Sequence, residues 1–154
     1  MNVTIRQATI ADLDLLLGIN LSSFEANAGF DRYIDMNWVH TDHARKLFTK
    51  AITDKNHHTI VAEAEGKMIG FLMLQPKELP YRTAKTIELE ILAVLPEYRS
   101  MRVGSQLITK AKEWAKTKGC TTMMVSSYSK NARAIEFYKR EGFETVDISL
   151  ELDL

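Results

Sequence analysis

Two glutamates, Glu88 and Glu90, lie two residues apart in a run of mostly apolar residues at 86–95. The alternation of this run predicts a β-strand that carries one apolar face, Ile87, Leu89, Ile91 and Ala93, and a second face, Glu88, Glu90, Leu92 and Val94. Two carboxylates on the same side of a strand repel each other, which raises the pKa of one of them. Such a carboxylate can accept a proton from a substrate. Both are therefore candidate general bases, unless they attract a cationic group or pair with Lys or Arg.

The turn that follows this strand has the features of a phosphate-binding site. It runs over residues 99–105 and leads into an amphipathic run that predicts a helix over about 103–118. The first N–H groups of a helix have no partner within it, and the helix dipole adds partial positive charge. Gly104 would allow a phosphate to approach the backbone, and Arg99 and Arg102 add charge. The alternative is an ordinary turn with two solvated arginines.

The same turn resembles the GNAT superfamily of N-acetyltransferases, which carries Arg/Gln-x-x-Gly-x-Gly/Ala there. Arg99 and Gly104 match the first and last named positions, and Arg102 replaces the middle glycine. The flanking residues 92–98 and 105–108 are similar to the family's usual sequence. Residues 131–143 resemble a second signature, Asn-x-x-Ala-x-x-x-Tyr-x-x-x-Gly-Phe, and residues 5–13 resemble the family's first strand and helix start.

The resemblance implies an α/β fold: a single N-acetyltransferase domain over residues 1–154, with a mixed, mostly antiparallel central sheet of about six to seven strands flanked by about four helices. It implies acetyl-CoA as the cosubstrate. It also implies a set of residues that bind this molecule, with Leu92 and Val94 acting through their backbone: Leu92, Ala93, Val94, Arg99, Met101, Arg102, Val103, Gly104, Ser105, Asn131 and Tyr138.

The resemblance further assigns catalytic roles. Glu88 matches the base of histone acetyltransferases in this superfamily, and Glu90 matches an acidic position in several small-molecule acetyltransferases. Tyr138 matches the tyrosine near the coenzyme A sulfur and is the candidate general acid; the alternative is a half-buried core tyrosine. Asn131 is either only a helix N-cap or also a partner of the pantetheine arm.

Local patterns predict the other elements. Helical spacing of apolar residues predicts helices near 13–24, 42–52 and 131–141, and two apolar runs around Glu65-Gly66 predict a β-hairpin. We expect further strands at 3–6 and 121–126, and two short final strands at 144–147 and 149–152. The four histidines lack the spacing of a metal site, so we expect no bound metal and surface positions for them.

Composition limits the class of partner. The chain has 20 Lys and Arg against 20 Asp and Glu, so its net charge of zero gives no indication of binding to nucleic acid or a membrane. The single cysteine, Cys120, cannot form an internal disulfide, and the first ten residues lack the pattern of a signal peptide. We expect a cytoplasmic protein.

These observations predict an N-acetyltransferase that transfers acetyl from acetyl-CoA to a primary amine of a small molecule or peptide, by direct attack in a ternary complex. The alternative function is a non-catalytic acyl-CoA-binding sensor or scaffold. The acceptor stays open: the acids and aromatics of residues 24–40 either recognise a cationic amine or pack that loop onto the body. A homodimer through the last residues is a further expectation, which the sequence does not decide.

Overall fold

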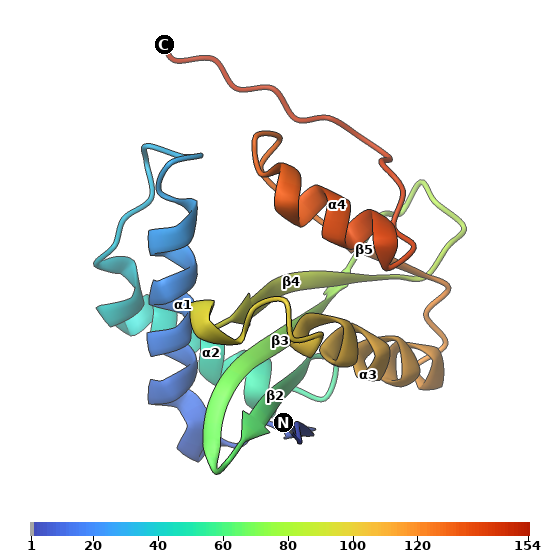
Figure 1. The fold of residues 1–154 in the computed structure, drawn as a ribbon. Helices are drawn as coiled ribbons and strands as arrows, with labels where there is room; N and C mark the ends of the chain where they lie inside the picture. Colours follow the sequence, from blue (N-terminus) through green and yellow to red (C-terminus); the bar gives the residue numbers. More distant parts are fainter. Residues whose placement is uncertain (1) are drawn as a thin grey trace.

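The protein, described here from a computed structural model over residues 2–154, is built on one five-stranded sheet. The strands are β1 (Thr4–Gln7), β2 (His58–Ala64), β3 (Lys67–Lys77), β4 (Thr86–Val94) and β5 (Thr122–Val125). They lie in the order β1-β2-β3-β4-β5, with every pair antiparallel except the parallel pair β4 and β5 (Figure 1). The sheet is therefore mixed and mostly antiparallel, as expected.

Helices cover both faces of this sheet. The helices α1 (Leu13–Asn27) and α2 (Asp42–Thr53) pack against one face, and α3 (Val103–Thr117) and α4 (Ala132–Arg140) cover the other (Figure 1). Short 3₁₀ turns lie at Ile10–Asp12, Trp38–His40 and Pro96–Tyr98. The predicted α/β class and the four helices are confirmed. Within residues 2–154 no helix is long and apolar enough to cross a membrane.

The predicted hairpin forms between β2 and β3. Glu65 and Gly66, with φ of 52° and 76°, both adopt the left-handed conformation that a two-residue turn of this kind requires. This hairpin is the centre of the sheet, and its buried residues contribute to both hydrophobic cores.

A β-bulge in β4 overturns the expected alternation of that strand. Met73 pairs with Ile91 while Leu74 pairs with Leu89, so Glu90 is an extra residue on β4. The prediction of one continuous apolar face is therefore wrong. Ile87 and Leu89 pack on the side of α3, whereas Ile91 and Ala93 pack on the side of α1 and α2, and Leu92 and Val94 take the side of α3.

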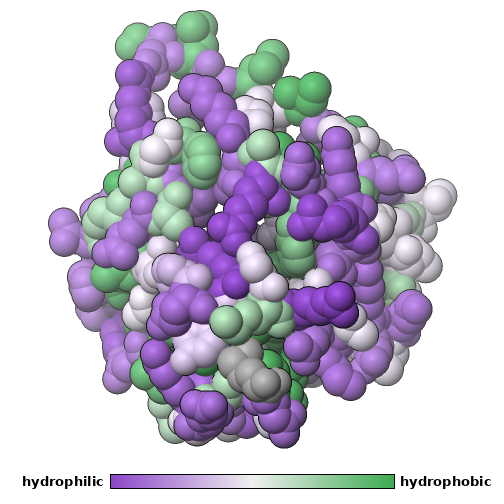
Figure 2. All heavy atoms as spheres, viewed as in Figure 1, coloured by the Kyte–Doolittle hydropathy of each residue, from purple (hydrophilic) through white to green (hydrophobic). Residues whose placement is uncertain are grey.

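The predicted final strands at 144–147 and 149–152 are also wrong, so the sheet has five strands rather than six or seven. Residues 144–154 form an extended tail that crosses above α4 toward the loop after α1 (Figure 1). Its alternating residues Val146, Ile148, Leu150, Leu152 and Leu154 are each at least 67% exposed. Figure 2 shows hydrophobic atoms along the top of the molecule, where this tail runs. A strand pattern alone does not form a strand, because the backbone also needs a neighbour to pair with.

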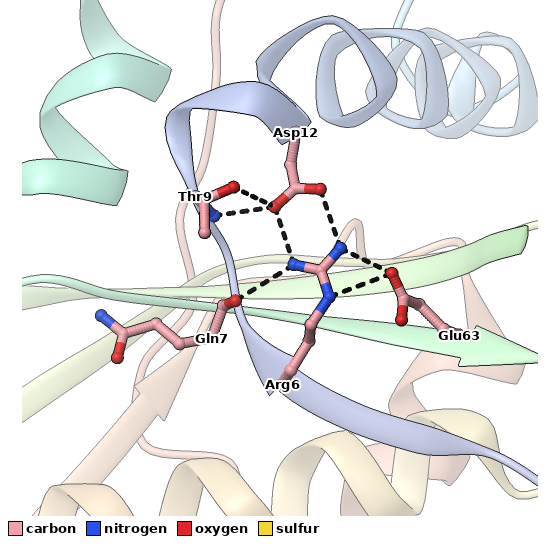
Figure 3. A network of polar contacts seen from close by, with 5 residues as sticks. All are labelled: Arg6, Gln7, Thr9, Asp12 and Glu63. Carbon is pink, nitrogen blue, oxygen red and sulfur yellow. Dashed lines mark hydrogen bonds and ion pairs between the residues drawn. The ribbon is translucent and has the colours of Figure 1, made fainter. Parts of the chain in front are cut away.

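An ion-pair network fastens the first strand to the body (Figure 3). The Arg6 guanidinium donates to both carboxylate oxygens of Asp12, at 2.8 and 2.9 Å, and to Glu63 on β2. Asp12 also accepts from the backbone N–H and the hydroxyl of Thr9. The hydrogen bonds from Arg6 hold the pKa of Asp12 well below its usual range. The network fixes the start of α1 against β1 and β2.

Candidate active site

The central feature of the site is a place where two strands separate. The pairing of β4 with β5 covers only Thr86–Leu89 against Thr122–Val125. β4 continues to Val94, so Ile91–Val94 pair with β3 alone, and no strand within residues 2–154 covers their other backbone edge. An open strand edge presents N–H and C=O groups that an extended ligand can pair with.

Four polar side chains form a cluster on the α2 side of this separation. The Gln75 amide nitrogen donates to a carboxylate oxygen of Glu88, at 3.0 Å, and to one of Glu90, at 2.7 Å. The Lys77 ammonium lies 2.5 Å from the other oxygen of Glu88. Burial and the nearby charge of Glu88 raise the pKa of Glu90. The two glutamates therefore differ: Glu88 is ion-paired, and Glu90 holds its proton more readily than an ordinary glutamate.

Tyr138 lies on the opposite face of the sheet. It packs with the apolar groups around α3, which include Leu92 and Val94 of β4, and contacts Phe137 and Phe143 edge-on. Burial raises the pKa of its phenol to about 12. The hydroxyl makes no hydrogen bond within residues 2–154, so it is free to donate to a ligand. Glu90 and Tyr138 thus flank the sheet from opposite sides near the point where β4 and β5 part.

The turn before α3 leaves its backbone donors free. Arg102 takes the N-cap position with φ of 61° and ψ of 14°, and no side chain caps the helix. In the described part of the chain, the N–H groups of Val103, Gly104 and Ser105 have no acceptor. An uncapped helix start of this kind favours an anion. Arg102 adopts the left-handed conformation that a glycine would adopt without strain, and its side chain is exposed.

Some predicted phosphate-binding residues have protein partners instead. The Arg99 side chain donates from Nε to the Val94 carbonyl at 3.0 Å, which locks the turn against β4. The Ser105 hydroxyl donates to Glu141 at 2.5 Å. Gly104 faces a ring: an added Cβ would lie 3.0 Å from Cζ of Phe137, so the glycine allows α3 and α4 to approach.

The other predicted cofactor residues are distributed around the same turn and strand. Asn131 is the N-cap of α4, where its Oδ1 accepts from the Ala134 N–H at 3.1 Å, and its amide nitrogen lies 3.4 Å from Asn27. The side chains of Ala93 and Val103 are buried in the two cores, so only their backbone could contact a ligand. Met101 is half exposed at the tip of the turn.

The acids and aromatics of the loop after α1 hold that loop in place. Asp31 accepts from the Tyr128 hydroxyl at 3.0 Å, and Phe30 stacks on the Tyr128 ring. Asp35 accepts from the backbone N–H of Asn37. Of the two interpretations left open above, packing of the loop is the one that these contacts support.

Three groups near the site were not identified from sequence. Arg133, in the first turn of α4, donates to the Ser100 hydroxyl at 3.3 Å, and burial together with the nearby charge of Arg133 lowers the pKa of Arg99. Gln75 and Lys77 complete the glutamate cluster from β3. Gln75 and Lys77 are two residues apart, as Glu88 and Glu90 are, and this equal spacing was the one feature of the sequence that could have indicated the cluster.

The expectation of four surface histidines is also wrong in part: His58 stacks on Trp114 with ring centroids 4.4 Å apart, and burial lowers its pKa to about 4.

Comparison with known proteins gives consistent results. Residues 23–143 match the model of the acetyltransferase (GNAT) family. The chain is 32% identical over 148 residues to an uncharacterized N-acetyltransferase of Methanocaldococcus jannaschii, covering 94% of this chain but only 62% of that relative's length. It is 26% identical to a spermidine N(1)-acetyltransferase of Thermoplasma acidophilum, covering 96% and 91% of the two chains. An N-acetyltransferase of T. acidophilum, solved with coenzyme A, superposes with a TM-score of 0.82 at 22% identity over 97% of this chain and 94% of that one.

Proposed function

The chain belongs to the acetyltransferase (GNAT) family and is an acetyl-CoA-dependent N-acetyltransferase; on that premise we propose that it acetylates a primary amine of a small molecule by direct attack in a ternary complex. The observation that carries this proposal is the separation of β4 from β5 beyond Leu89, with Glu90 on one face and Tyr138 on the other. This arrangement supports entry of the two substrates from opposite faces of the sheet.

The residues around the turn fit the cosubstrate. The pyrophosphate would lie at the uncapped start of α3, where three N–H groups lack acceptors, with Arg133 and Arg102 adding positive charge. The open edge of β4 beyond Glu90 would pair with the amides of the pantetheine arm, and the N–H of Leu92 is the group proposed to polarise the thioester carbonyl. Arg99 would then act as a positioning residue, because its Nε already holds the Val94 carbonyl.

Glu90 is the proposed general base. A free alkylamine has a pKa of about 10 and must lose a proton before or during attack. Glu88 is ion-paired with Lys77, whereas the raised pKa of Glu90 brings it closer to the working pH. The amine nitrogen forms the new bond to the acetyl carbon, its proton passes to Glu90 or to a water next to it, and the carbon–sulfur bond breaks.

Tyr138 is the proposed donor to the departing sulfur. With a pKa of about 12, its phenol is a weaker acid than a thiol of about 8.5, so a full proton transfer is uphill. A half-buried phenol with no other partner among the described residues is nevertheless a strong hydrogen-bond donor to a developing thiolate. We therefore propose that Tyr138 stabilises the thiolate by a hydrogen bond, and that the thiolate is protonated as the product leaves.

Titration calorimetry with acetyl-CoA, followed by a thiol-release assay against a panel of primary amines, tests the proposal. Micromolar binding with thiol release is the expected result, and initial rates that vary both substrates should give intersecting lines in double-reciprocal plots. Parallel lines would instead indicate a covalent acetyl-enzyme and reject direct attack. Binding without release from any amine would support the sensor or scaffold.

A homodimer is a second part of the proposal. The tail at 144–154 alternates five exposed apolar residues with polar ones, and β5 has no second strand partner within residues 2–154. We propose that the tail pairs with a second copy of the chain. Light scattering should give a dimer mass for the wild type and a monomer mass for Ile148→Asp with Leu150→Asp. Ser149→Asp, on the polar side, is the matched control and should stay dimeric.

A cytoplasmic location is proposed as well. Its support is limited to Cys120, the single cysteine, which suits a reducing compartment.

A further inference from the structure

A pocket of about 320 Å³ lies between α2 and the sheet, and Glu90 is part of its wall. The other strand residues in the wall are Met73, Leu74 and Gln75, which places the pocket next to the glutamate cluster. A cavity of this size suits a small molecule, near the lower end of the range for ligand sites. The candidate base thus borders this pocket while its side chain stays accessible to solvent.

The opposite wall of the pocket is basic. Residues His43, Lys46, Leu47 and Lys50 lie three or four positions apart on α2, so they share one face of that helix, and all four line the pocket. Neither Lys46 nor Lys50 forms an ion pair within the described residues, whereas Arg45, which directly precedes Lys46, pairs with Asp14. Two lysines without an ion-pair partner among the described residues therefore line the same pocket as Glu90, and both are exposed to solvent.

His57 adds an imidazole to this wall. Its side chain is only 12% exposed and lines the pocket, and its buried Nδ1 makes no hydrogen bond. The nearest carboxylate oxygen, from Asp54, is 3.6 Å away, too far for a hydrogen bond. A buried polar atom without a partner costs free energy unless a ligand or water satisfies it.

Three acidic residues that could have bound a cationic acceptor form contacts within the protein instead. Asp31 and Asp35 hold the loop after α1, and Asp153 pairs with Arg32. The lining of this pocket contains one acidic residue, Glu90, against two lysines. The pocket thus has a carboxylate that can accept an amine in one wall and cationic side chains in the opposite wall.

We infer that the acceptor is a small primary amine that also carries an anionic group, with its amine at Glu90 and its anion between Lys46 and Lys50. This inference rests on the proposed function, since it assigns the amine to the proposed base. The apolar side chains of Leu47, Ala51 and Met73 complete the wall and fit a short aliphatic part. An amino acid carboxylate has this chemistry, while a polyamine, which carries only positive charges, does not.

Matched pairs of amines test the inference. Leucine is compared with 3-methylbutylamine, which lacks only the carboxylate, and β-alanine with ethylamine, with spermidine as the polycation. We expect kcat/KM for each anionic amine to exceed that of its partner by about 10-fold or more, as one or two charge-assisted hydrogen bonds would give. In the double variant Lys46→Met with Lys50→Met this ratio should fall toward one, mainly through KM. Lys116→Met, an exposed lysine on α3, should keep the ratio.

A binding measurement separates this inference from the proposed function. Calorimetry with N-acetylleucine, in the presence of coenzyme A, should show binding that weakens about 10-fold or more in the double variant. Such binding without turnover of any amine would support the pocket and reject the proposed function. Turnover that favours spermidine or 3-methylbutylamine, with no effect of the double variant, would reject the anionic acceptor and leave the proposed function intact.

Discussion

Replacement of Glu90 by glutamine tests the chemistry of the site most directly. The change keeps the size of the side chain and its contact with Gln75 but removes the group that can take a proton. General bases contribute about 10²- to 10⁴-fold, and we expect the low end of this range because Glu90 is exposed enough for water to substitute for it. A loss of about 10²-fold in kcat corresponds to about 2.7 kcal/mol in the barrier.

The pH profile gives this prediction a sharper form. Glu90 must be deprotonated to act, so kcat/KM should rise with pH through the raised pKa of this group. Removal of the negative charge of Glu88 takes away one cause of that shift, so Glu88→Gln should move the acidic limb to lower pH. Glu90→Gln should abolish the limb. Thiol release measured from pH 4 to 9, with the amine well below its KM, records all three profiles.

Glu113→Gln is the matched control, because Glu113 is an exposed glutamate of α3 paired with Lys110. It should leave both the rate and the pH profile unchanged. If Glu90→Gln retains turnover within about threefold, or if Glu88→Gln shifts the limb upward, Glu90 does not act as the base.

Three other substitutions test separate parts of the structure. Tyr138→Phe should leave acetyl-CoA affinity within a few fold and lower turnover by about 10²-fold, and unchanged turnover would remove Tyr138 from the mechanism. Arg102→Gly should raise Tm by about 2–4 °C, since a left-handed arginine costs on the order of 1 kcal/mol, whereas Met101→Gly next to it should not. Arg6→Met should lower the free energy of unfolding by about 2 kcal/mol at pH 7, as it leaves a buried Asp12 carboxylate unpaired. Because Arg6 lowers the pKa of Asp12, the stabilisation is complete above the unfolded value of about 3.9 and is lost as pH falls through the folded value. An equally steep loss below pH 4 in Arg6→Met would contradict this assignment.

The elements that the sequence predicted well are those specified by contacts close in the chain. The helix stripe of α3, the turn at Glu65-Gly66 and the cap at Asn131 each depend on residues within a few positions of one another. The tail at 144–154 has an equally clear strand pattern but forms no strand. Alternation predicts which side chains would share a face, whereas a strand also needs a paired edge, and that depends on the rest of the chain.

The surroundings of the candidate site could be predicted only in part, for the same reason. Sequence motifs point to Glu88, Glu90 and Tyr138 as candidates, but the partners of the two glutamates come from β3, eleven to fifteen positions away. Which residue of β3 lies opposite Glu88 depends on the register, and the register depends on the bulge. The basic face of α2 was missed because lysines on an amphipathic helix have no local feature that separates a pocket wall from solvated surface.

The bulge at Glu90 connects the fold to the chemistry. On a regular strand Leu92 and Val94 would lie on the same face as Glu88. Their side chains would then point toward α1 and α2. The extra residue returns Leu92 and Val94 to the side of α3 and Tyr138, while both glutamates stay on the side of α2. Bulges of this kind redirect side chains and end strand pairing, and here the pairing of β4 with β5 ends at Leu89, one residue before it. One added residue thus accounts for both the open strand edge and the separation of the proposed base, Glu90, from the proposed thiolate donor, Tyr138.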